Sequence, residues 1–155
     1  MSSSPVVSIR DLDTAECEAL LGRHNVGRLA FSFKDRVDIQ PIGYVYERAW
    51  LSCRTEPGTK LQTLNHSPWV AFEVDEAHGP YDWESVVIRG TVYLMPEGSD
   101  DHAATVAAIQ RVAPLAFTEA DPTPFRNIVF RVYPREMTGR RASSSADPSG
   151  SSTRR

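Results

Sequence analysis

Leu51-Ser-Cys-Arg-Thr-Glu-Pro-Gly-Thr-Lys-Leu61 is the most informative stretch of this 155-residue sequence. A short apolar strand leads into it, Pro57-Gly58 predicts a turn, and a helical pattern begins directly afterwards. Backbone N–H groups and the dipole at a helix N-terminus attract anions, while arginine and lysine bind phosphate oxygens. We interpret the segment as a phosphate clamp, with a solvated basic turn as the open alternative. Its two cations and two hydroxyls fall within seven residues: Arg54, Thr55, Thr59 and Lys60.

The bulk composition is that of a soluble globular protein, with 41% hydrophobic and 24% charged residues. A formal net charge of −3 argues against general attraction to nucleic acid. No apolar run approaches the ~20 residues of a membrane helix, and no signal peptide is visible. The two cysteines, Cys17 and Cys53, suggest neither a disulfide framework nor a metal site, so we expect a cytoplasmic protein.

Hydrophobic periodicity predicts mostly hairpin-linked strands with helices between them, which favours an antiparallel barrel or an α+β sheet. The pattern indicates helices over residues 13–21, 59–65 and 100–113, and strands over 26–33, 37–46, 49–53, 70–75, 86–95 and 128–133. We expect residues 76–82 to be irregular and the strand over 86–95 to be buried on both faces. Pro41 predicts a strand edge or bulge, where a ligand can meet bare backbone, and Gly90 a bulge or close approach.

The domain is expected to span residues 1–141. Residues 142–155 are rich in Ser, with Pro, Gly and Arg and no apolar anchor, and they predict a disordered tail.

Three segments, in this order and spacing, resemble the pyridoxamine-5′-phosphate-oxidase-like family of flavin-binding split β-barrels. They are Cys53–Leu61, Val70–Glu76 and Trp83–Gly90. The branch most similar to this chain contains nitroimidazole-resistance-type proteins, and the resemblance covers roughly residues 10–137.

The resemblance implies a six-stranded antiparallel split β-barrel with peripheral helices, usually a homodimer with FMN at the subunit interface. Packing or strand-end hydrogen bonding would explain Trp83 and Ser85 without any cofactor. The implied cofactor-binding residues fall into three sets: Arg54, Thr55, Thr59 and Lys60 around the flavin phosphate; Gln40, Pro41 and Ile42 with their backbone at the isoalloxazine edge; and Trp83, Ser85 and Val86, completing the pocket from the partner subunit.

The chain departs from the family in two places. Many nitroimidazole-resistance-type members carry a histidine near the position of Cys53, so chemistry resting on that histidine does not carry over. The arginine- and histidine-bearing C-terminal motif of true pyridoxamine-phosphate oxidases is also not apparent, so vitamin B6 oxidation is not expected. The substrate is therefore left open as an unspecified small molecule.

The leading hypothesis is an FMN-dependent oxidoreductase, in which the flavin performs electron transfer and the protein supplies binding and orientation. One alternative is a reductase of the same fold that uses the deazaflavin F420, although its acidic tail would need more cations than Lys34, Lys60 and scattered arginines provide. A second alternative is a non-catalytic flavin-binding or flavin-sensing module. We expect a homodimer, because long apolar strands give a small monomer more hydrophobic surface than it can cover.

Overall fold

The computed structural model describes residues 4–58, 64 and 67–145. Seven strands and two helices lie within these residues. Their bounds are β1 (Val6–Asp11), α1 (Thr14–Arg23), β2 (Val26–Phe33), β3 (Arg36–Glu47), β4 (Trp50–Thr55), β5 (Trp69–Gly79), β6 (Asp82–Leu94), α3 (Asp100–Gln110) and β7 (Ile128–Ser145).

All strand pairs are antiparallel, and the sheet runs in the order β1-β7-β4-β3-β2-β5-β6. A further pairing of β6 with β7 closes six of these strands into a ring. The predicted six-stranded antiparallel barrel is thereby confirmed, with β1 as an additional strand on the outer half of β7.

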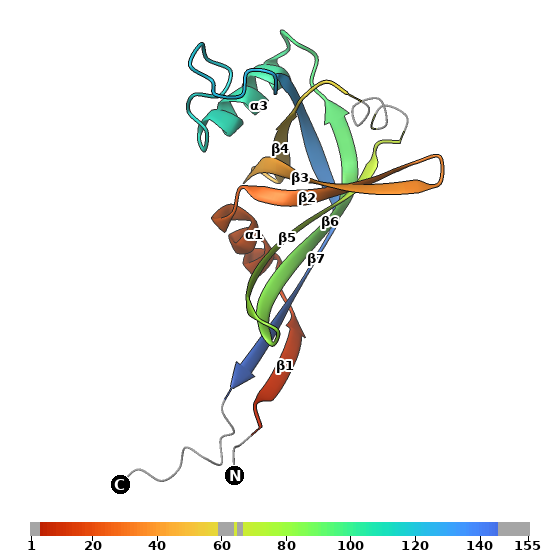
Figure 1. Ribbon diagram of the computed structural model, residues 1–155, viewed down its shortest axis with the longest axis vertical. Helices are drawn as coiled ribbons and strands as arrows, with labels where there is room; N and C mark the ends of the chain where they lie inside the picture. The colour runs from red at the N-terminus through yellow and green to blue at the C-terminus, as the bar shows by residue number, and fades with distance from the viewer. Residues whose placement is uncertain (1–3, 59–63, 65–66, 146–155) are drawn as a thin grey trace.

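The molecule is elongated (Figure 1). At one end, α3 and the chain that follows it lie against β4. At the other end a narrow stem is formed by the β5–β6 hairpin, β1 and the last part of β7, with α1 packed alongside (Figure 1). The β2–β3 hairpin projects sideways between the two ends.

The predicted start of α1 is confirmed in its details. The Asp13 carboxylate accepts a hydrogen bond from the Glu16 backbone N–H at 2.8 Å, and the Glu16 carboxylate accepts one from the Asp13 N–H at 3.2 Å. This capping box satisfies two donors that a helix start would otherwise leave unpaired. Cys17, Leu20 and Leu21 then point into the core from one face of the helix, as their spacing predicts.

The core is built from alternate residues of each strand, because successive side chains of a strand point to opposite faces. β6 follows this rule, with Val86, Ile88 and Val92 buried and Val87 only half-buried. The expectation that this strand is buried on both faces is therefore wrong for the single chain. Gly90 marks a register shift against β7, and a Cβ there would lie 2.3 Å from the Tyr133 carbonyl oxygen. The predicted bulge and close approach are confirmed.

Three other expectations need correction. Residues 76–82 are not irregular, because β5 continues to Gly79 and pairs with β6 in a tight hairpin. The strand predicted to end at Tyr133 runs on to Ser145, paired first with β6 and then with β1. Residues 142–145 are therefore ordered, and Ala142 is only 1% exposed. Cross-strand pairing orders these segments, although their local sequences favour turns or disorder.

Two predicted segments fall mostly outside the described residues. They are the helix over 59–65, of which only Leu64 is described, and residues 146–155 of the predicted tail. Leu64 is 2% exposed and packs in the core, as its place in the helical pattern predicts.

Candidate functional site

Arg54 lies near the end of β4 and holds the chain segment that follows α3. Its Nε donates to the Arg126 carbonyl oxygen at 2.8 Å, and Nη2 donates to the Thr123 carbonyl oxygen at 3.0 Å. Nη2 also forms an ion pair with the Asp121 carboxylate at 2.7 Å, and both side chains are at most 10% exposed. The guanidinium lies 4.5 Å from the centre of the Phe117 ring. The remaining nitrogen, Nη1, makes no hydrogen bond within the described residues.

Asp121 organises the segment around that arginine. Its carboxylate accepts hydrogen bonds from the backbone N–H groups of Phe117, at 2.8 Å, and Thr123, at 2.9 Å. These two donors, followed by Arg54, hold the pKa of Asp121 well below its usual value because they stabilise the charged form. The backbone of Phe117 adopts a φ of 64°, which is rare for a bulky residue and is held here by the turn around Asp121.

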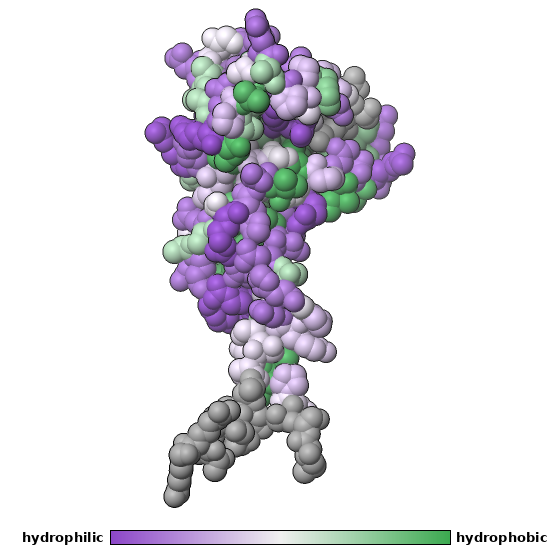
Figure 2. All heavy atoms as spheres, turned by 60° about the vertical axis from the view of Figure 1, so that its left-hand side comes forward, coloured by the Kyte–Doolittle hydropathy of each residue, from purple (hydrophilic) through white to green (hydrophobic). Residues whose placement is uncertain are grey.

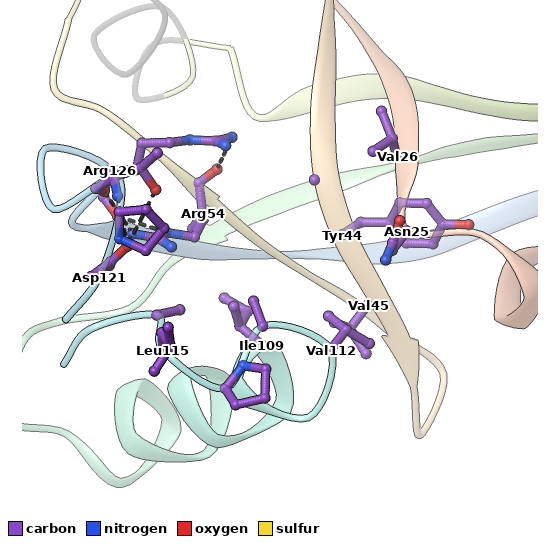
Figure 3. A pocket seen from close by; sticks show the side chains of 16 residues that line it. Asn25, Val26, Tyr44, Val45, Arg54, Ile109, Val112, Leu115, Asp121 and Arg126 are labelled. Atoms are coloured by element: carbon purple, nitrogen blue, oxygen red, sulfur yellow. Dashed lines mark hydrogen bonds and ion pairs between the residues drawn. The ribbon is translucent and has the colours of Figure 1, made fainter.

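A cavity of about 430 Å³ lies between β3, the beginning of β2 and the segment after α3 (Figure 3). Arg54, Asp121 and Arg126 form its polar end. Hydrophobic side chains form most of the remaining wall: Val26, Val45, Ile109, Val112 and Leu115. A mostly apolar hollow with a few polar groups at one end is typical of a small-molecule site.

Part of the cavity wall is open to solvent. Val26, Val112 and Leu115 are 53%, 48% and 54% exposed, which is unusual for aliphatic side chains on a polar surface. Figure 2 shows hydrophobic atoms gathered in the upper part of the molecule, and a mostly hydrophilic surface over the stem below them.

The structure places the predicted backbone set near Arg54 and Thr55, the two residues of the predicted clamp that it describes. Gln40, Pro41 and Ile42 lie in the part of β3 that pairs with β2 alone among the described strands, so the predicted edge at Pro41 is confirmed. The side chain of Ile42 is buried in the core, and Gly43, the next residue, already lines the cavity. The buried Thr55 follows Arg54 at the end of β4.

The third predicted set lies elsewhere in the single chain. Trp83 and Ser85 are on the part of β6 that forms the stem, where they pair with Ala77 and Asp75 of β5. Val86 is fully buried in the core. None of these three residues lines the cavity, so their contribution from a partner subunit stays a prediction. Thr59 and Lys60 lie outside the described residues.

The stem carries the other prominent group of charges. Glu84, on β6, accepts from Arg141 of β7 at 2.7 Å and also pairs with Arg23 of α1. Arg141 continues to Glu16 at 3.1 Å, and Arg10 of β1 reaches the same carboxylate at 2.6 Å. The hydrogen bond from Arg10, then the one from the Asp13 backbone, lowers the pKa of Glu16 to about 2. Each carboxylate here is satisfied by cations of the chain itself, so the network ties α1 to the stem.

The sequence model of the family described as pyridoxamine 5′-phosphate oxidase matches residues 13–141. The chain belongs to this family. Its relatives include an uncharacterized protein of Rhizobium meliloti (strain 1021), 25% identical over 131 residues that cover 84% of this chain and 83% of the relative.

Solved structures of the family agree with the fold. The crystal structure of an FAD-binding protein from Mesorhizobium loti matches with a TM-score of 0.74 and 28% identity, covering 87% of this chain and 99% of that one. An FAD-binding protein from Mycobacterium smegmatis matches with a TM-score of 0.61 and 26% identity, over 85% and 99% of the two chains. The fold is shared with a putative 5-nitroimidazole antibiotic resistance protein from Bacteroides thetaiotaomicron, which is 19% identical. That match has a TM-score of 0.73 and covers 95% of this chain and 96% of the other.

Two charged residues of the cavity, Asp121 and Arg126, were not predicted from the sequence. They lie 67 and 72 residues beyond Arg54, and no local pattern in the Pro-rich connection predicts them. Within the described residues, no group of His, Cys, Asp and Glu side chains could hold a metal ion. No helix among them is long and apolar enough to cross a membrane.

Proposed function

We propose that the protein binds a flavin nucleotide and acts as a flavin-dependent oxidoreductase on a small molecule. The observation that carries this proposal is a mostly apolar cavity with the Arg54 guanidinium at its polar end, directly beside the edge of β3. The relatives from M. loti and M. smegmatis, described as FAD-binding, support a flavin. FMN is the flavin that the sequence favoured. We also propose a cytoplasmic location, as the sequence suggests.

The residues present fit a flavin phosphate. Arg54 offers Nη1 while Asp121 fixes the orientation of its guanidinium. Thr55, Thr59 and Lys60 would add hydroxyls and a second cation, and a charge-assisted hydrogen bond to phosphate is stronger than a neutral one. The backbone of residues 40–42 would meet the ring edge. The flavin supplies the electron transfer, so the chain needs only to bind it, orient it and exclude water.

We propose a twofold dimer that completes this site. Val37, Ile39 and Trp69 are 81%, 62% and 57% exposed on β3 and at the start of β5, and a second copy would cover such apolar surface. The same arrangement would bring Trp83 and Ser85 of a second copy to the clamp, which they do not reach within one chain. A flavin-loaded protein that sediments as a monomer at micromolar concentration would contradict the dimer.

The first experiment is identification of the ligand that co-purifies with the protein. Heat denatures the protein and releases its ligand into the supernatant. The released ligand is then compared with FMN, FAD and F420 by absorption and chromatography. A flavin nucleotide is the expected result. F420 would establish the deazaflavin alternative, and a colourless protein that also binds no added flavin would overturn the proposal.

Turnover separates an enzyme from a binding module. Flavin-loaded protein is mixed with NADH or NADPH and an artificial acceptor, and oxidation of the nicotinamide is followed. Steady turnover is expected, whereas its complete absence in loaded protein would favour a flavin-storing or flavin-sensing module.

A further inference from the structure

At the polar end of the cavity, Arg126 is a cation without a carboxylate partner among the described residues. Its neighbour Arg54 is neutralised by Asp121, the one acidic side chain among the described residues that line the cavity. Arg126 is half-buried, and its guanidinium makes a long contact of 3.5 Å from Nη2 to the Arg54 carbonyl oxygen. Within residues 4–58, 64 and 67–145 no carboxylate pairs with it. One net positive charge therefore faces a mostly apolar hollow.

The backbone of Arg126 is itself fixed. Its carbonyl oxygen accepts from Nε of Arg54 at 2.8 Å, and its N–H donates to the Thr123 carbonyl oxygen at 3.0 Å. Each guanidinium group thus donates to the backbone carbonyl oxygen of the other arginine. Both groups lie at the same end of the cavity (Figure 3). Two anchored guanidinium groups at one point, one paired with Asp121 and one unpaired, offer N–H donors to two linked phosphates rather than to one.

The position of the cavity on β3 indicates what lies beyond those phosphates. Residues 40–42 form the edge proposed for the flavin ring, and Gly43 and Val45, further along the same strand, line the cavity. The clamp residue Arg54 lies at the cavity end. A flavin placed over residues 40–42 would leave the apolar hollow empty, whereas a second aromatic group beyond the phosphates would fill it. Its volume, about 430 Å³, is in the range of small-molecule sites.

We propose that this cavity is the subsite for the adenosine half of FAD, with Arg126 binding the second phosphate. The inference rests on the proposed flavin function and makes it more specific, because FMN has neither group. The adenine ring lies among the side chains of Val26, Val112 and Leu115, whose exposure the ligand removes. The segment after α3 is then a selectivity element that distinguishes a dinucleotide from a mononucleotide.

The test compares the dissociation constants of FAD, FMN and riboflavin for the full chain, followed by quenching of flavin fluorescence. Arg126→Ala removes the second cation, and Leu115→Trp fills the cavity from a half-exposed position that the fold does not need. The matched control is Arg111→Ala. It removes an arginine from the same segment, one that pairs with Glu47 at 2.9 Å and lines no part of the cavity.

Wild-type protein is expected to bind FAD more tightly than FMN. Arg126→Ala should weaken FAD binding by about ten- to a hundredfold, the usual effect of one charge-assisted contact, and leave FMN binding unchanged. Leu115→Trp should reduce the affinity for FAD to that for FMN, and Arg111→Ala should change neither. Free ADP should compete with FAD in the wild type and lose that ability in Arg126→Ala.

The other outcomes separate this inference from the function on which it rests. Equal losses of FMN and FAD in Leu115→Trp would place the flavin ring itself in the cavity and overturn the adenosine subsite. FMN binding as tight as FAD binding would overturn it too, while leaving flavin binding intact. ADP or NADPH could also bind FMN-loaded protein through Arg126 while the affinity for FAD is no higher than that for FMN. In that case the subsite serves a nicotinamide donor, and the assignment to FAD is wrong. Absence of binding by any flavin would overturn the proposed function as well.

Discussion

The two ends of the molecule use arginine in opposite ways. In the stem, Arg10, Arg23 and Arg141 are at least 36% exposed and share the carboxylates of Glu16 and Glu84. At the cavity end, the side chain of Arg54 is about 10% exposed, and no other arginine in the described part of the chain pairs with its partner carboxylate, Asp121. A further arginine, Arg126, lies beside it with no carboxylate partner in the described part of the chain.

The difference separates a structural role from a binding role. A network in which every acid is matched by cations, and in which the arginines are exposed to solvent, fastens one element to another and offers nothing to a ligand. A buried pair that fixes one guanidinium next to an unmatched one creates a place that attracts an anion.

Loss of Arg54 should have the largest effect on stability. Arg54→Leu leaves the Asp121 carboxylate buried without its cation, and breaking a buried pair from one side typically costs about 3–5 kcal/mol. Arg23→Leu should cost about 1 kcal/mol or less, because Arg23 is exposed and Glu84 keeps its ion pair with Arg141. Urea unfolding of the ligand-free proteins measures both. Similar losses in the two variants would mean that the two ends do not differ in this way.

Lys60 should affect binding rather than stability. If it contacts the flavin phosphate, Lys60→Ala removes one charge-assisted contact, worth about 1.5–3 kcal/mol of binding free energy. Riboflavin lacks the phosphate, so its weaker binding should not respond, and the melting temperature of the ligand-free protein should stay the same. Equal weakening of FMN and riboflavin would show that Lys60 shapes the pocket in general, and no weakening would favour a solvated basic turn.

Acid should loosen the attachment of α1. Hydrogen bonds from arginines lower the pKa of Glu16 to about 2 and also lower that of Glu76, from an ordinary value of 4.5. Stability from these contacts is therefore complete above about pH 4.5 and is lost as the pH falls towards 2. Hydrogen exchange should show α1 amides losing protection over this range while the amides of β2 keep theirs. Protection of α1 that stays constant down to pH 2 would contradict the structural role of the network.

The smallest effect is expected at the C-terminus. A chain ending at Ser145 should keep its melting temperature and flavin affinity, because residues 146–155 contain no large apolar side chain to bury. A chain ending at Arg140 should melt at a lower temperature, since it loses the Arg141 contacts and the buried Ala142. If both truncations behave alike, the end of β7 does not contribute to the stem.

Local signals in the sequence were sufficient to predict much of the fold. The Asp13–Glu16 spacing predicts the capping box, and alternation with a Lys34-Asp35 turn predicts the first hairpin, where both residues have the positive φ that such a turn requires. The end of β7 and the whole of β1 were missed, because they are ordered by pairing with each other and not by their own composition.

In the candidate site, too, local sequence signals predicted some residues and missed those that depend on distant contacts. Arg54, Thr55 and residues 40–42 lie on adjacent strands, as the predicted clamp and ring edge require. Asp121 and Arg126 were not predictable, because their part in the site depends on a contact with β4 across about half of the chain. The prediction for Trp83, Ser85 and Val86 depends on a second subunit, which a single chain does not test.

The central claim is that the cavity end binds a flavin through its phosphate. The most direct measurement is the ratio of the dissociation constants of riboflavin and FMN for the wild-type protein, at fixed pH and low salt. The account predicts that FMN binds at least about tenfold more tightly, since the phosphate gains one or more charge-assisted contacts. Equal affinities for the two, or no binding of either, would contradict it.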